Sequence, residues 1–216
     1  MGTTLEAYYR SRASEYDRFY QNPERQDDLA RLRAWLIDYV RGRTVLEVAA
    51  GTGYWTEVAA PVCKAIAATD SATETLAVAA KRRLGPHVEL LAADAYDLPQ
   101  FASAFDVGMA HLWWSHVEKQ RQQEFLSGFM GRLKRDALVL MIDQIYVEGI
   151  CPQVSRYDER DNRYELRKLQ NGAIYEIVKN YPSDEELLNS FAQFSEDIQI
   201  LRLNHFWALS ARNRAR

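Results

Sequence analysis

Apolar segments of strand length alternate with amphipathic helical segments along the first two thirds of the chain. The predicted strands cover residues 44–49, 65–70, 88–92, 105–111 and 137–143. The predicted helices cover roughly residues 5–20 and 23–40, a segment from about 54, a segment ending near 84, and residues 120–133. This alternation is typical of a parallel sheet with helices on both faces.

The segment 145–182 interrupts this pattern. It is rich in charged and aromatic residues and contains a hairpin signal, in which Asn171-Gly172 suits a type I′ turn. A helix over 183–194 follows, with a capping-box start at Ser183. The chain closes with predicted strands at 197–203 and 205–211, which a tight break separates. We therefore expect an antiparallel C-terminal strand pair on an α/β, doubly wound, mostly parallel sheet.

Composition and charge narrow the class of protein. The 216 residues carry 27 basic and 30 acidic side chains, and their formal charge of −3 gives no positive excess for nucleic acid or a membrane surface. The length suits one core, and no Pro- or Gly-rich linker divides the chain. We predict a single domain over 1–216, with an N-terminal helical cap at 1–41 and an insertion at 145–182.

The two cysteines, Cys63 and Cys151, lie far apart and form neither a disulfide framework nor a zinc-binding spacing. No metal site is predicted. The N-terminal residues lack an apolar signal region, and no run approaches the ~18 apolar residues of a membrane span. These features predict a cytoplasmic protein.

A glycine-containing turn, Glu47-Val-Ala-Ala-Gly-Thr-Gly53, connects the first predicted strand to the next helix. Such a turn is compatible with simple structural punctuation and also with close approach of the backbone to a ligand. Asp70 ends the second strand, where an acid can accept hydrogen bonds from a ribose diol. Asp94 follows the third strand. Because the carboxyl ends of parallel strands meet at one edge, these positions indicate a single ligand-binding crevice.

These segments resemble the class I S-adenosylmethionine-dependent methyltransferases, specifically small bacterial enzymes that act on small molecules. The resemblance covers nearly all of the chain and rests on four segments and the final strand pair. The segments are 45–53, 68–71, 93–95 and 105–111. One departure is Ala49, where many members have glycine. The resemblance implies a Rossmann-like sheet of seven strands, with S-adenosylmethionine as cofactor and S-adenosylhomocysteine as product.

Two other functions stay open at this point. A nicotinamide-dependent oxidoreductase would need a third glycine, but Tyr54, Trp55 and Thr56 follow Gly53. A non-catalytic cofactor-binding protein of the same fold is the other alternative. The polar positions retained at the strand ends argue against it.

The resemblance also implies the residues of the cofactor site. Tyr9 and Tyr16 would close over the cofactor from the N-terminal helix, or Tyr16 would only anchor that helix on the core. The other implied residues are Glu47, Ala49, Gly51, Thr52, Gly53, Asp70, Ser71, Asp94, Ala95, Ala110 and His111.

The segment after the fourth strand is where this family builds its acceptor site. A histidine there can take a proton near neutral pH. His116 is the first candidate base and His111 the second, although each is equally compatible with a packing role. Asp143, at the end of the fifth strand, is expected to orient His116 or to bind an acceptor amine.

Four further residues complete the predicted acceptor site. Of Trp113 and Trp114, one is expected to pack inward and the other to line the pocket, and Tyr146 and Arg167 are expected to bind substrate. The predicted reaction is methyl transfer to an O or N atom of a small molecule. The acceptor itself and the choice between monomer and homodimer stay open.

Overall fold

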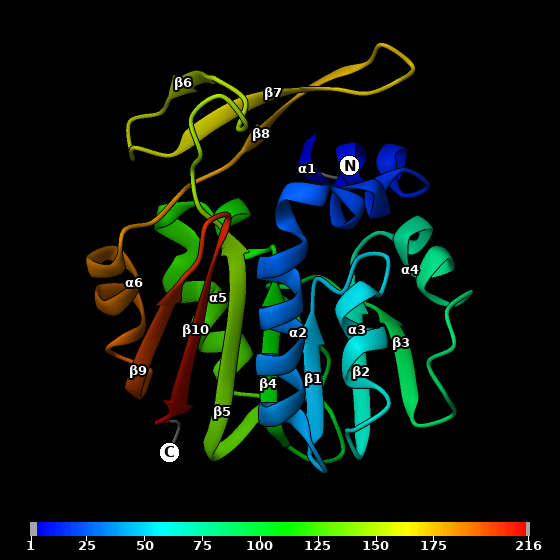
Figure 1. Ribbon diagram of the computed structural model, residues 1–216. Helices are drawn as coiled ribbons and strands as arrows, with labels where there is room; N and C mark the ends of the chain where they lie inside the picture. The colour runs from blue at the N-terminus through cyan, green and yellow to red at the C-terminus, as the bar shows by residue number, and fades with distance from the viewer. Residues whose placement is uncertain (1–3, 215–216) are drawn as a thin grey trace.

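A seven-stranded sheet in the order β3-β2-β1-β4-β5-β10-β9 forms the centre of the molecule (Figure 1). Its strands are β1 Thr44–Val48, β2 Ala65–Asp70, β3 Val88–Ala92, β4 Phe105–His111, β5 Leu133–Gln144, β9 Ser195–Arg202 and β10 Phe206–Asn213. Strands β1 to β5 pair in parallel, and β10 pairs antiparallel with both β5 and β9. The predicted fold class, with its antiparallel C-terminal strand pair, is confirmed.

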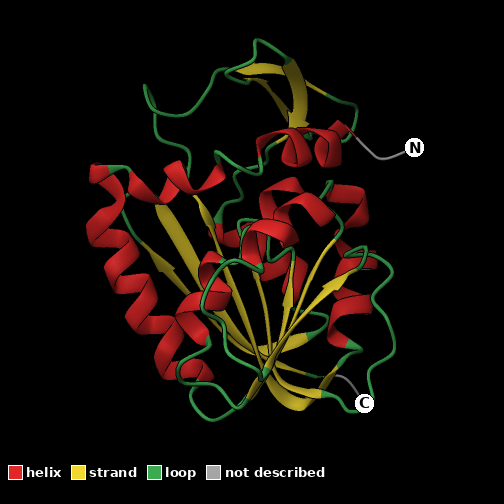
Figure 2. Cartoon of the chain, turned by 90° about the vertical axis from the view of Figure 1, so that its right-hand side faces the viewer, coloured by secondary structure: helices red, strands yellow, loops and turns green. Residues whose placement is uncertain are grey.

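The computed structural model describes residues 4–214, so the outermost residues of the predicted domain and cap, 1–3 and 215–216, lie outside the described residues. The α-helices are α1 Thr4–Arg12, α2 Gln26–Val40, α3 Tyr54–Ala59, α4 Thr73–Ala79, α5 Gln122–Met130 and α6 Asp184–Phe191. The short 3₁₀ helices are Tyr16–Gln21, Pro23–Arg25, Trp114–His116 and Lys119–Arg121. Figure 2 shows helices on both sides of the large sheet.

Alternating side chains of the strands build a separate core on each face of the sheet. In β1, Leu46 belongs to the cluster that includes Phe125 of α5. Its neighbour Val45 belongs to the opposite cluster, together with Leu36 of α2. Burial on both faces explains why β1 reads as an almost continuous apolar run.

A second sheet, in the order β6-β7-β8, lies beyond the carboxyl ends of β1 to β5 and next to α1 (Figure 1). Its strands are β6 Val154–Tyr157, β7 Arg163–Lys168 and β8 Ile174–Val178. The β7–β8 hairpin turns at the expected Asn-Gly pair, with Gly172 at φ +86°. Strand β6 was not predicted, because its four residues are all exposed and provide no buried face for a pattern to reveal. We call these three strands the roof sheet.

The helix predicted over 5–20 is broken. Helix α1 ends at Arg12, and a 3₁₀ helix follows at Tyr16–Gln21. The bend lets Tyr20 stack on Tyr54 of α3, with ring centroids 3.6 Å apart, while Tyr8 packs under the roof sheet beside Ile177. Aromatic packing in two directions therefore outweighs the continuous helical pattern.

Candidate active site

The turn after β1 has a left-handed backbone at three positions. The φ angle is +56° at Ala49, +56° at Gly51 and +76° at Gly53. A Cβ added to Gly51 would meet no atom within 4 Å, so this part of the turn borders open space. At Ala49, where the resembled family often has glycine, an L-residue holds a conformation that favours glycine.

Asp70 holds this turn against the start of α4. Its Oδ2 accepts a hydrogen bond from the Gly51 backbone N–H at 2.8 Å. Its Oδ1 accepts from the Ala72 N–H at 2.9 Å and from the Thr75 hydroxyl at 3.1 Å. Burial raises the pKa of Asp70, and these hydrogen bonds oppose that rise. Since a carboxylate has about four lone-pair sites, about one remains for a ligand.

A cavity of about 470 Å³ lies at the carboxyl ends of the strands. We call it the larger cavity, in contrast to a smaller one with which it shares a wall. A separate cavity, of about 790 Å³, is lined by other residues, among them Trp114, Tyr146 and Glu186. Ten of the thirteen residues expected to bind cofactor line the larger cavity. These are Tyr9, Tyr16, Ala49, Gly51, Thr52, Asp70, Ser71, Asp94, Ala95 and His111. The crevice expected from the strand ends is therefore present, and α1 and the roof sheet complete its walls.

Three of the expected cofactor residues, Glu47, Gly53 and Ala110, do not line this cavity. Glu47 lies beneath the turn, where it accepts a hydrogen bond from the Thr56 hydroxyl at 2.6 Å. Its burial raises its pKa to about 8. A Cβ on Gly53 would lie 2.8 Å from the Ala79 Cβ, so this glycine permits close packing of the turn on α4. Ala110 is fully buried in the core.

Two polar side chains of the larger cavity lack partners in the part of the chain that the structure describes. Both ring nitrogens of His111 are buried without a hydrogen-bond partner, and so is Nε1 of Trp113. Burial lowers the pKa of His111 to about 3, so the ring is neutral. Unpaired polar atoms are costly inside a protein, and a bound polar ligand would remove that cost.

His116 lies between α1 and the roof sheet. Its Nδ1 is 2.7 Å from the Val178 carbonyl oxygen, and its Nε2 is 2.7 Å from the Tyr9 hydroxyl. A carbonyl oxygen only accepts, so Nδ1 carries the proton, and Nε2 accepts from Tyr9. Burial and the nearby charge of Lys179 lower the pKa of His116 well below its usual value. The ring is therefore a neutral base with Nε2 as its basic atom.

Within the described part of the chain, Asp143 forms hydrogen bonds with Ser115 and not with His116, which it was expected to orient. It is fully buried and accepts from the Ser115 N–H at 2.8 Å and the Ser115 hydroxyl at 3.0 Å. The ammonium group of Lys179 lies 3.2 Å from its Oδ1. No hydrogen bond joins Asp143 to His116 among residues 4–214, and Asp143 does not line the larger cavity. It instead fixes the backbone of the residue that precedes His116.

A second cavity, of about 280 Å³, lies behind the larger one. We call it the smaller cavity. The two share one wall, made by Tyr9, Tyr16, Leu112, His116 and Ile177. Leu112 follows β4 with φ +57°, a strained conformation for a leucine. The shared wall therefore places the candidate base between two chambers.

The four expected substrate residues separate in the structure. Trp113 lines the larger cavity and Arg167 the smaller one. Trp114 is buried in the core beside Phe191, with ring centroids 4.9 Å apart. Tyr146 is 46% exposed and, together with Trp114, lines the separate cavity of about 790 Å³. Trp113 thus lines the larger cavity, whereas Trp114 packs inward and borders, with Tyr146, the separate cavity.

Some residues that line the two cavities could not be identified from sequence patterns. Ile177 and Val178 of β8 reach the larger cavity only because the roof sheet folds over it. Arg25, at the start of α2, reaches the smaller cavity from a segment with no recognised motif. Leu112 could have been suspected from its place after β4, next to the predicted His111.

Residues 4–214 lack two classes of feature. No group of three or more His, Cys, Asp or Glu side chains is placed to hold a metal ion there. No helix in that range is long and apolar enough to cross a membrane.

Comparison with known proteins agrees with this geometry. A family model described as a methyltransferase domain matches residues 45–136, from β1 into β5. Among solved structures, the complex of DhpI with SAH is similar at 28% identity, covering 99% of this chain and 97% of that chain with a TM-score of 0.78. No curated protein sequence matches the chain.

Two more distant structures share the fold. The first is 1,6-didemethyltoxoflavin-N1-methyltransferase of Burkholderia thailandensis, at 17% identity, with 98% and 88% of the two chains covered and a TM-score of 0.66. The second is the N-methyltransferase NodS of Bradyrhizobium japonicum, at 14% identity, with 99% and 100% covered and a TM-score of 0.69.

The methyltransferase-domain match, the fold and the similarity to an SAH complex together support the identification of the chain as a class I S-adenosylmethionine-dependent methyltransferase. Its class is therefore a methyl-transferring enzyme, and the nicotinamide-dependent and non-catalytic alternatives are not supported.

Proposed function

We propose that this enzyme transfers a methyl group from S-adenosylmethionine to an O or N atom of a small molecule. The cofactor would occupy the larger cavity, and the acceptor would meet it at the shared wall. The observation that supports this most strongly is the position of His116, which borders both cavities. A neutral basic atom at that boundary suits a reaction in which the acceptor loses a proton.

The residues of the larger cavity fit the cofactor in charge and shape. The remaining lone pair of Asp70 suits a ribose hydroxyl, and the open space at Gly51 lets a ligand approach the backbone closely. The unpaired nitrogens of His111 and Trp113 provide polar partners. Asp94 uses its Oδ1 to accept from the Tyr96 N–H at 2.9 Å, which leaves its Oδ2 for an amino group.

The bound cofactor would supply an electrophilic methyl group on a sulfonium sulfur. The protein's contribution is then to align the acceptor with that methyl group, to exclude water and to receive a proton. Tyr9 and Tyr16 line the boundary between the cavities, and burial raises the pKa of both phenols, which keeps them neutral. In the proposal the acceptor proton passes to Nε2 of His116, and the Tyr9 hydroxyl bonded there relays it.

Calorimetric titration tests this function directly. The protein is titrated with S-adenosylmethionine, S-adenosylhomocysteine and NADH. Binding of the first two and not of NADH is expected. If neither sulfur compound bound, the proposal would fail. Release of S-adenosylhomocysteine in the presence of a panel of small hydroxy and amino compounds then reports turnover.

A further inference from the structure

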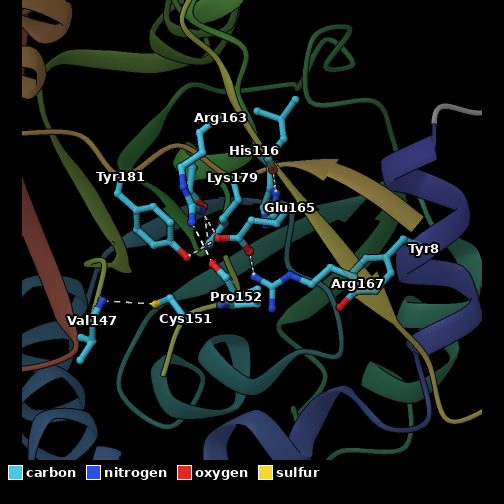
Figure 3. Close-up of polar contacts among 12 residues, drawn as sticks. Tyr8, His116, Val147, Cys151, Pro152, Arg163, Glu165, Arg167, Lys179 and Tyr181 are labelled. Atoms are coloured by element: carbon cyan, nitrogen blue, oxygen red, sulfur yellow. Dashed lines mark hydrogen bonds and ion pairs between the residues drawn. The ribbon is translucent and has the colours of Figure 1, made fainter. Parts of the chain in front are cut away.

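Positive charge surrounds the smaller cavity without matching negative charge. Its lining includes no Asp or Glu side chain among the residues that the structure describes. The lining cations are Arg12, Arg18, Arg25, Arg167 and Lys179. Figure 3 shows Lys179 and Arg167 next to one buried carboxylate, Glu165. Three of these cations lie within the first 25 residues, whereas Arg167 lies in β7 and Lys179 directly follows β8.

Three of the lining arginines, Arg12, Arg18 and Arg25, form no ion pair with a carboxylate within residues 4–214, and of these Arg18 is exposed to solvent. Arg12 donates to the Tyr8 hydroxyl at 2.6 Å and lies 5.2 Å from the Tyr16 ring centroid. Arg25 donates to the Phe19 carbonyl oxygen at 3.2 Å, and its Nε is buried without a partner. Burial lowers the pKa of Arg25; the nearby Cys151 and Glu24 oppose this fall, and the charges of Arg12 and Arg167 add to it. The guanidinium groups of Arg12 and Arg25 thus keep free donors close to the cavity.

The carboxylates behind the cavity wall do not balance this charge. Asp143 pairs with Lys179 at 3.2 Å. Glu165 is shared between Arg167, at 2.5 Å, and Arg163. Two buried carboxylates therefore face three cations, and Arg12 and Arg25 add two more. Burying unpaired charge is costly, so such an excess indicates a site completed by an anion.

We propose that the smaller cavity binds a compact oxyanion, either a carboxylate or a phosphate-like group, carried by the methyl acceptor. This inference rests on the proposed function, because the shared wall places the anion beside the reacting methyl group. Guanidinium groups bind such oxyanions through paired N–H donors. The volume of about 280 Å³ admits only a small molecule. The acceptor class is therefore a small hydroxy or amino compound with one anionic group.

The test measures anion binding apart from catalysis. The protein, saturated with S-adenosylhomocysteine, is titrated calorimetrically with sodium phosphate, sodium acetate and choline chloride at matched ionic strength. Phosphate, acetate or both should bind, and the stronger of the two identifies the type of oxyanion. Choline should not bind. Equal heats for all three titrants would overturn the inference.

Variants locate the bound ion. Arg25→Gln and Arg167→Gln should each weaken anion binding by about tenfold or more. Arg202→Gln should not, because Arg202 pairs with Asp184 at 2.7 Å and lines neither cavity. The Arg25 variant breaks no ion pair but loses a hydrogen bond and a ring contact to Phe19, so urea unfolding of each variant is measured alongside to confirm that it is folded. Unchanged anion binding in both cavity variants would refute the assignment.

Two further outcomes separate this inference from the proposed function. If S-adenosylhomocysteine abolished phosphate and acetate binding, the cations would serve the cofactor's own carboxylate, and the inference would be overturned. If S-adenosylhomocysteine did not bind at all, the proposed function would fail. The anion titration on the unliganded protein would then decide the inference alone.

Discussion

The buried carboxyl group of Glu47 makes the stability of the fold depend on pH. Its folded-state pKa of about 8 lies above the ordinary value of 4.5, because burial disfavours the charged form. A carboxyl group whose pKa is raised on folding stabilises the folded protein fully at pH values below its unfolded-state pKa. This stabilisation is lost as the pH rises through about 8. Because proton binding is linked to folding, the difference between the folded-state and unfolded-state pKa values of Glu47 lowers the free energy of unfolding by about 3 to 4 kcal/mol between about pH 5 and pH 8.

The substitution Glu47→Gln isolates this contribution. The glutamine Oε1 can still accept from the Thr56 hydroxyl but does not ionise. At low pH the variant should be no more stable than the wild type, because its extra N–H donors enter a buried site. As the pH rises, the wild type alone loses the Glu47 contribution, which in a chain of this size equals a fall of about 6 to 16 °C in Tm.

Urea unfolding of both proteins at several pH values measures the difference. Glu89→Gln serves as the matched control, since Glu89 is an exposed acid on β3. The control should follow the wild type at every pH. If Glu47→Gln also followed the wild type, with no change in the difference between pH 5 and pH 8, Glu47 would ionise normally and the burial argument would be wrong.

Three other substitutions test the site. Asp70→Ala should weaken S-adenosylhomocysteine binding by about 10- to 100-fold, because it removes a ligand contact and frees the Gly51 N–H; a calorimetric Kd equal to that of the wild type would contradict this. His116→Ala should leave that Kd nearly unchanged and lower turnover by about 10²- to 10⁴-fold. With wild-type enzyme, kcat/KM should show no titration near pH 6.5, because the pKa of His116 is lowered, and a limb there that His116→Ala removed would refute the burial argument. Gly53→Ala should reduce the free energy of unfolding by about 1 to 3 kcal/mol, read from urea midpoints, because its Cβ would press on Ala79; an unchanged midpoint would show that the turn yields.

Local patterns were sufficient to predict most of the fold. Buried strands such as β1 and β2 appear as short apolar runs, and the start of α6 at Ser183 shows its capping box both in the sequence and in the structure. Strand β5 begins four residues earlier than predicted, because Leu133 pairs with Phe105 of β4. Pairing between distant strands leaves no signal in a local pattern, so this boundary could not be predicted.

Some residues of the candidate site could likewise be predicted from the sequence, and others could not. Residues at strand ends, such as Asp70 and His111, could be predicted because the topology of a parallel sheet brings those ends together. The alternative uses of Glu47 and Gly53 could not, since both depend on packing beneath the turn. Arg25 joins the smaller cavity only through tertiary folding, so no spacing in the sequence indicates it.

The roof sheet enters the chain as one continuous insertion, between β5 and α6. Its removal or exchange would leave every hydrogen-bonded pairing of the large sheet in place, because none of its strands pairs with that sheet. Changes in this segment can therefore alter the walls of both cavities, because its residues line each of them, while the pairing of the large sheet stays constant. For protein engineering, the roof sheet is a segment whose exchange would reshape both cavities without disturbing the strand order of the large sheet.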